Sequence, residues 1–189
     1  MERKLNAELW DKMHYLFRDY NDRMVHVELR YDFEIDINAL KTVLVCFLEK
    51  APVLHSSFTD NRIAPYWIVK NYKIDDVLMV KTVSEDLLEK EINSFLVQYI
   101  PPDADLQIKV AVFNHSGKSV LCVVENHMCM DGGDLKYFMK ALCENYTNFV
   151  EKGISPVELR TGTRSYESVY EDFSAGEKKL AKNLYKNIN

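Results

Sequence analysis

The sequence predicts an α/β protein, a two-layer α+β sandwich in which helices cover a mixed, largely antiparallel sheet. Segments with helical spacing and segments with alternating spacing of apolar residues follow one another along the chain. The segment 120–124 is apolar on both faces, which is typical of a central strand in a covered sheet. The 189 residues, 47% hydrophobic and 28% charged, have the composition of a globular protein of one domain or two small ones.

The first half of the chain alternates between the two spacings. Asp36 or Asn38 can cap a helix that continues to Lys50, and Pro52 prevents its extension. Residues 24–34 alternate apolar and polar side chains, as expected of a half-buried strand. The remaining elements expected here are a helix over 5–21 and strands over 56–60, 65–70 and 77–83.

The second half adds a helix, a hairpin and a longer helix. Ser84 can cap a helix to about Tyr99, and a hairpin over 108–124 turns at residues 115–118. The long helix begins after Asp134 and stops at Lys152-Gly153. One or two short polar helices are expected, around 166–173 and 177–185. We therefore expect a lobe over 1–153 and a linker or crossover segment over 154–189.

Charge and cysteine content exclude several classes of protein. The chain has 24 Lys and Arg against 29 Asp and Glu, a net charge of −5, and no basic cluster, which disfavours nucleic acid as a partner. No apolar run reaches the roughly 20 residues of a membrane span. No secretory signal is evident, so we expect a cytoplasmic protein. The cysteines lack the spacing of a zinc site, and we expect buried thiols: Cys46, Cys122, Cys129 and Cys143.

The most informative segment is the loop between the buried strand and the long helix. It contains His127, which can act as a general base near neutral pH, and Asp131, which could orient the imidazole or hold the loop through an arginine. Gly132 permits close approach of the backbone. From spacing alone, a structural interpretation stays open: a histidine bonded to backbone, followed by a turn that starts a helix.

His127 to Gly132 has the form H-x-x-x-D-G, which resembles the H-H-x-x-x-D-G signature of the chloramphenicol acetyltransferase-like superfamily. This superfamily includes the condensation domains of peptide synthetases and plant acyltransferases of the BAHD type. The resemblance covers about residues 5–152. It includes the helix to Lys50, the segment 51–58 and the strand over 108–113.

The resemblance implies a chloramphenicol acetyltransferase-like lobe and an acyl transfer reaction. His127 would take a proton from a hydroxyl, amine or thiol acceptor, a small molecule that then attacks an acyl thioester of coenzyme A or of a carrier-protein pantetheine arm. No bound cofactor or metal is implied. Asp131 would bond an arginine and support the loop, with Arg30, Arg62 or a residue outside the chain as candidates. Gly132 would keep side chains out of the channel.

The sequence departs from the family pattern in three ways. Asn126 replaces the first motif histidine, which is mainly structural in the family, and His55 stands where arginine is frequent. Family members of this arrangement are about twice as long and carry a second lobe. Two alternatives therefore stay open: a non-catalytic binding or scaffold module, and a half-chain that needs a C-terminal lobe or another subunit.

Histidines and aromatic residues outside the motif have simpler expectations. His14, His26 and His115 are expected at the surface, and Trp10 and Trp67 are expected to be packing residues. Trp10 and Tyr15 could instead line a substrate entrance if the first helix borders the channel.

Overall fold

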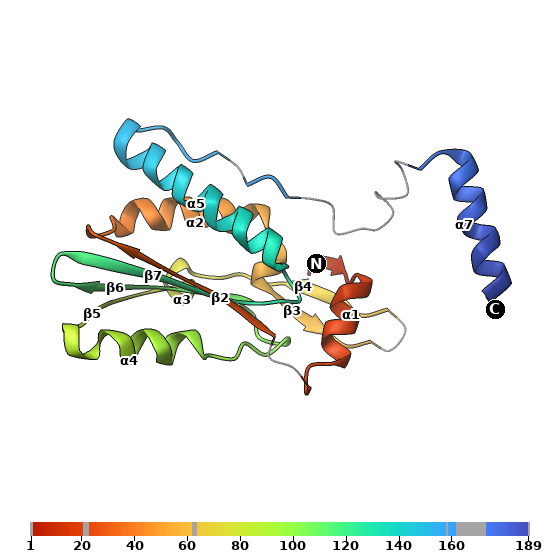
Figure 1. Cartoon of the computed structure of the whole chain (residues 1–189), viewed down its shortest axis with the longest axis horizontal. Helices are drawn as coiled ribbons and strands as arrows, with labels where there is room; N and C mark the ends of the chain where they lie inside the picture. Colours follow the sequence, from red (N-terminus) through yellow and green to blue (C-terminus); the bar gives the residue numbers. More distant parts are fainter. Residues whose placement is uncertain (1, 21–22, 62–63, 158, 162–172, 189) are drawn as a thin grey trace.

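A computed structural model of the chain describes residues 2–20, 23–61, 64–157, 159–161 and 173–188 (Figure 1). Its main sheet has the strand order β2-β7-β6-β5. The pairs β2–β7 and β6–β7 are antiparallel, and β5 runs parallel to β6. The strands are β2 (Met24–Tyr31), β5 (Leu78–Thr82), β6 (Ile108–His115) and β7 (Lys118–Asn126). The predicted mixed, largely antiparallel sheet is therefore confirmed.

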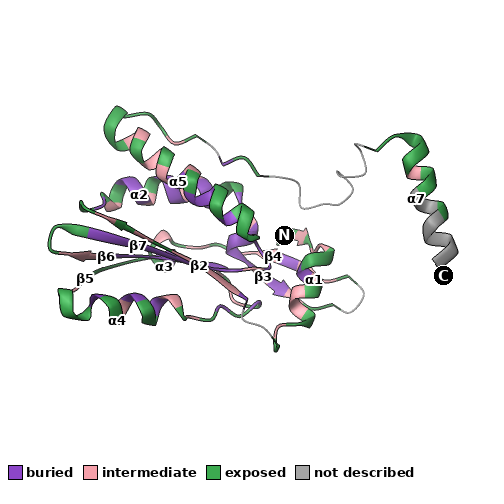
Figure 2. Cartoon of the chain, viewed as in Figure 1, coloured by how far each residue is buried: buried purple, intermediate pink, exposed green. Residues whose placement is uncertain are grey.

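Helices cover both faces of this sheet (Figure 1). On one face lie α2 (Ile37–Lys50) and α5 (Gly132–Lys152), which pack together through the edge-to-face rings of Phe47 and Phe138. On the other face α4 (Glu85–Leu96) packs Phe95 against Phe113 of β6. The α4 helix thus adds a third layer to the predicted two. Because both faces are covered, β7 is buried along almost its whole length (Figure 2).

A second, three-stranded sheet has the order β1-β4-β3. Its strands are β1 (Lys4–Asn6), β3 (Ser56–Thr59) and β4 (Tyr66–Val69). The predicted helix over 5–21 is wrong at its start, because residues 4–6 pair with residues 66–68, and α1 spans only Leu9–Leu16. Tertiary pairing has overridden the local helical spacing here.

The remaining boundaries follow local sequence signals. Asp36 caps α2 as predicted, with its Oδ1 accepting the N–H groups of Asn38 and Ala39. Gly153 ends α5 in the left-handed conformation, at φ 63°. Two four-residue helices were not predicted, η1 (Pro52–His55) and α3 (Ile74–Val77). They are too short to show a helical period.

The C-terminal segment begins as a connection without regular structure. In this segment Leu159 is buried against the core of the lobe. The predicted helix at 177–185 lies within α7 (Ala175–Ile188), whereas that at 166–173 falls almost wholly outside the described residues. Among the described residues, no helix is long and apolar enough to cross a membrane.

Candidate active site

The predicted loop follows the central strand β7 and leads directly into α5, at the end of the sheet near α1 (Figure 1). The backbone N–H of His127 donates to the carbonyl of Arg23 over 2.8 Å, so the β2–β7 pairing continues one residue beyond the strand. His127 is half-buried, and its neighbours Met128, Cys129 and Met130 are buried in the core. The pairing with Arg23 and the burial of residues 128–130 therefore fix the His127 backbone, while its side chain remains partly accessible.

The His127 ring is held by a backbone carbonyl. Its Nδ1 lies 2.9 Å from the oxygen of Met130. Because a carbonyl oxygen can only accept, Nδ1 carries the proton in the neutral ring, and Nε2 keeps its lone pair. An imidazole in this tautomer can accept a proton at Nε2, as a general base must.

Asn126 supports the loop from beneath. Its Nδ2 donates to the side-chain oxygen of Gln107 over 3.0 Å and to the carbonyl of Ile100 over 3.3 Å. Its Oδ1 accepts the N–H of Met128 over 3.1 Å. Asn126 and Gln107 are both buried. At the position of the first histidine in the resembling motif, the Asn126 amide therefore links the loop to the buried residues beneath it through hydrogen bonds.

Asp131 is exposed and caps α5. Its Oδ1 accepts the N–H groups of Gly133 over 2.7 Å and of Asp134 over 2.8 Å. Arg30, one expected partner of Asp131, instead pairs with Glu28 and Glu89. Arg62, the other named candidate, lies outside the described residues. Among the described residues, the support that Asp131 gives to the loop is that of a helix cap.

Gly132 does not need to be glycine for the fold of this lobe. Its φ lies outside the left-handed region, and a Cβ added there would meet no described atom within 4 Å. The space beside Gly132 is therefore open. A requirement for glycine here would have to come from a molecule or chain that approaches the loop.

His14 of α1 also belongs to this site, although the sequence placed it at the surface. The rings of His14 and His127 lie 4.7 Å apart between centroids, tilted by 39°. Burial lowers the pKa of His14, and the nearby His127 and Arg23 lower it further, whereas Asp11 raises it. The sequence offered no signal for this contact, because α1 and the loop are more than 100 residues apart. Of the other two histidines expected at the surface, His26 is exposed, whereas His115 is half-buried and bonds Glu85.

Two buried ionisable side chains flank the loop. Arg23 is only 4% exposed, and its three guanidinium nitrogens have no hydrogen-bond partner in the described part of the chain. Burial lowers its pKa. Both carboxyl oxygens of Glu125, the residue before Asn126, are buried, and no described residue offers them a well-aligned donor. Burial, with the charges of Asp134 and Asp131, raises the pKa of Glu125 well above its ordinary value, although the Met130 N–H opposes this.

The α1 helix presents an unusual distribution of side chains. It buries Asp11, whose Oδ2 accepts the indole N–H of the buried Trp67 over 2.9 Å. Tyr15 packs on Phe58 of β3. The apolar residues of α1 and of the segment after it are largely exposed, with Trp10 at 57%; this α1 face consists of Leu9, Trp10, Met13, Leu16, Phe17 and Tyr20. The α1 face lies next to the site, because the ring centroids of Trp10 and His14 are 6.4 Å apart.

His55 and the four cysteines, which the sequence analysis also considered, lie in the packed interior or are half-buried. His55 is buried, with Nδ1 2.7 Å from the carbonyl of Lys70 and its ring against Tyr72. The thiol of Cys129 points to the carbonyl of Val53. Cys122 is also buried, whereas Cys46 and Cys143 are only half-buried. Within the described ranges, no group of three or more His, Cys, Asp or Glu side chains could hold a metal ion.

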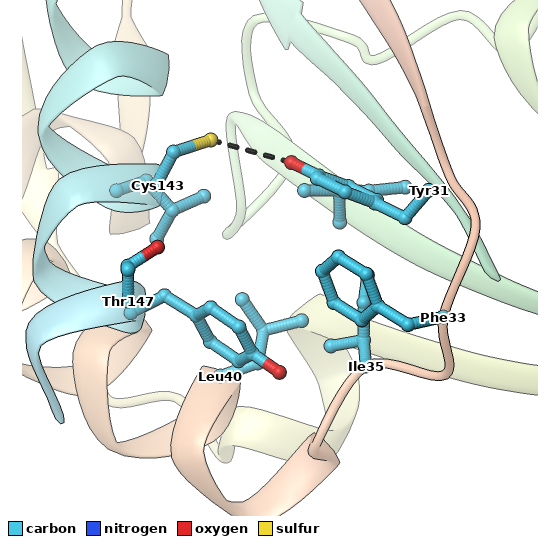
Figure 3. A pocket seen from close by; sticks show the side chains of 9 residues that line it. Tyr31, Phe33, Ile35, Leu40, Cys143 and Thr147 are labelled. Atoms are coloured by element: carbon cyan, nitrogen blue, oxygen red, sulfur yellow. Dashed lines mark hydrogen bonds between the residues drawn. The ribbon is translucent and has the colours of Figure 1, made fainter. Parts of the chain in front are cut away.

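A small apolar pocket lies away from this loop, between β2, α2 and α5 (Figure 3). Its volume is about 50 Å³, and the hydroxyl of Tyr31 lies 3.3 Å from the sulfur of Cys143 at its edge. Burial and this contact raise the pKa of Tyr31. The pocket is too small for a drug-sized ligand, which needs roughly 300 Å³ or more.

Several solved structures share the fold of this chain. The starter condensation domain of the rhizomide synthetase RzmA superposes with a TM-score of 0.74 at 12% identity, covering 98% of this chain and 48% of that one. The first condensation domain of the calcium-dependent antibiotic synthetase gives 0.69 at 15%, covering 97% and 48%. The X-domain from teicoplanin biosynthesis gives 0.65 at 18%, covering 93% and 38%. No protein-family model and no curated protein matches the chain.

These matches define the class of fold. The chain has the fold of a condensation-domain lobe and spans about half the length of the condensation domains that it matches. Condensation domains belong to the chloramphenicol acetyltransferase-like superfamily, so the fold predicted from the H-x-x-x-D-G resemblance is confirmed.

Proposed function

We propose that this chain is the His127-bearing lobe of an acyltransferase. It would transfer an acyl group from a thioester of coenzyme A or of a carrier-protein pantetheine arm to a hydroxyl, amine or thiol acceptor. The observation that carries the proposal is the His127 ring, whose Nδ1 is bonded to the Met130 carbonyl, so that Nε2 is left as a base. This base lies at the end of the central strand of a condensation-domain lobe.

The reaction needs one proton shuttle and no covalent acyl-enzyme. Nε2 of His127 takes the proton of the acceptor as the acceptor attacks the thioester carbonyl. The carbon–sulfur bond then breaks, and the imidazolium returns the proton to the departing thiolate. A positioned base of this kind contributes roughly 10²–10⁴ in rate. Asn126 and Asp131 support the loop in this scheme and do not touch the reacting atoms.

A second lobe or another subunit would complete the site. The chain covers 48% of the matched condensation domains. Arg23 lies buried without a partner in the described part of the chain, an arrangement that costs free energy until a carboxylate or another acceptor pairs with it. The residues of the α1 face are exposed and apolar, and the ring of Trp10 lies 6.4 Å from that of His14, which packs against His127. In this proposal residues 1–153 form the lobe, and 154–189 are a linker or crossover segment.

A binding module is the second candidate. An X-domain from teicoplanin biosynthesis that matches this chain, with a TM-score of 0.65, was solved in complex with the protein OxyB. The replacement of the first motif histidine by Asn126 also favours this candidate. A module of this kind would keep the fold and bind a partner protein without transferring an acyl group.

Acyl transfer by the protein, purified from its native host with any associated chain, tests the first candidate. Acetyl-coenzyme A and acyl thioesters of N-acetylcysteamine serve as donors, with alcohols and amines as acceptors. We expect His127→Ala to lower the rate by about 10²–10⁴. His26→Ala, a change at an exposed histidine of β2, is the matched control. Equal rates for His127→Ala and wild type refute the proposal, and a stable protein complex without acyl transfer supports the binding module.

A further inference from the structure

The contact between His14 and His127 joins two elements that are distant in sequence. The ring of His14 comes from α1, whereas His127 follows β7. The ring centroids are 4.7 Å apart, within the range of direct packing between rings. The Met130 carbonyl fixes one edge of the His127 ring through Nδ1. The ring of His14 therefore supplies a second, independent constraint on His127.

The groups around His14 favour its neutral form. Besides His127, the charged groups that act on it are Arg23, which opposes a positive charge, and Asp11, which favours one. Asp11 is already engaged, since its Oδ2 accepts the N–H groups of Trp67 and Glu8, each over 2.9 Å. A neutral His14 matters because two imidazolium rings at this separation would repel each other.

We propose that His14 is a positioning residue for His127: its neutral ring packs against the His127 ring and holds it in the orientation that bonds Met130 and presents Nε2. The inference rests on the proposed function for its effect on rate, but the coupling of the two rings does not depend on catalysis. While His14 stays uncharged, His127 can take up the proton of the acceptor without a second positive ring beside it.

The coupling can be measured on the chain alone. Proton NMR titration of the imidazole signals gives the pKa of His14 in wild type and in His127→Ala. We expect the pKa of His14 to rise in the variant, because the charge of His127 no longer opposes its protonation. The titration of His115, which bonds Glu85 on another part of the lobe, serves as the internal control and is expected to stay unchanged.

The positioning role is tested by two substitutions at one residue. His14→Ala removes the ring, and we expect kcat for acyl transfer to fall roughly ten- to a hundredfold with KM nearly unchanged. His14→Phe keeps a ring against His127, and we expect it to restore kcat to within about threefold of wild type. His115→Ala controls for the loss of a histidine elsewhere. Melting temperatures of all variants separate a loss of fold from a loss of positioning.

Three results would decide between the claims made for His14. An unchanged His14 pKa in His127→Ala overturns the coupling. A His14→Phe variant as slow as His14→Ala overturns positioning by ring packing. If the pKa rises but wild type transfers no acyl group, the ring pair stands and the proposed function fails.

Discussion

Replacing Asp131 with alanine removes two hydrogen bonds at the start of α5. Oδ1 accepts the N–H groups of Gly133 and Asp134 over 2.7 and 2.8 Å, and alanine leaves both without their partner. Loss of such a helix cap costs about 0.5–2 kcal/mol. Because Asp131 is exposed, water replaces part of the lost bonding, and we expect about 1 kcal/mol. For a chain of this size that corresponds to a melting temperature lower by roughly 2–4 °C.

Urea denaturation and thermal melting of the variant measure this loss. Asp36→Ala is the matched control, because Asp36 caps α2 through one carboxylate oxygen in the same way, with distances of 2.9 and 3.0 Å. Asp131→Ser keeps a capping oxygen and should stay within about 0.5 kcal/mol of wild type. If Asp131→Ala melts with wild type while Asp36→Ala melts earlier, the cap is not what this carboxylate contributes. Loss of acyl transfer in a stable Asp131→Ser variant would show that the negative charge itself has a role.

Three further substitutions probe the rest of the loop. The folded pKa of Glu125 is raised, so its contribution to stability is fully present below the unfolded pKa and declines as the pH rises toward the folded value. We therefore expect Glu125→Gln, which cannot ionise, to gain stability relative to wild type as the pH rises from about 5 to about 8, and parallel denaturation curves at all pH values would contradict this. Asn126→Ala removes the buried hydrogen bonds that the Asn126 amide makes with the side chain of Gln107 and the N–H of Met128, and we expect a loss of about 1–3 kcal/mol in urea denaturation. Gly132→Ala should keep or raise stability by about 0.4–1 kcal/mol while lowering acyl transfer, and unchanged transfer would mean that nothing approaches the loop there.

The sequence predicted the parts of the site that are local in the chain. The apolar run 120–124 indicated a central strand, and the structure has β7 there. The loop after it drew attention because His127 and Asp131 have the spacing of the H-x-x-x-D-G motif. The start of the long helix was predicted after Asp134, whereas α5 begins at Gly132 with Asp131 as its cap. The family position that Asn126 occupies was expected to be structural, and Asn126 bonds Gln107 and Ile100 there.

The parts that the sequence missed depend on tertiary contacts. His14 appeared to be one polar residue on an amphipathic helix, and only the packing of α1 beside the loop brings its ring to His127. The same packing buries Asp11 against Trp67 and leaves Trp10 exposed, the reverse of what an amphipathic pattern indicates. Residues 4–6 formed a strand because β4 offered a pairing edge, which no local spacing reports.

The tautomer of His127 is the most direct test of the central claim, that the loop presents Nε2 as a base. Nitrogen-15 NMR of the imidazole, recorded above about pH 8 where histidine rings are neutral, shows which ring nitrogen carries the proton. We predict a proton on Nδ1, donated to the Met130 carbonyl, and an unprotonated Nε2. A proton on Nε2 would contradict the account, because the nitrogen that should accept the proton of the acceptor would then be a donor.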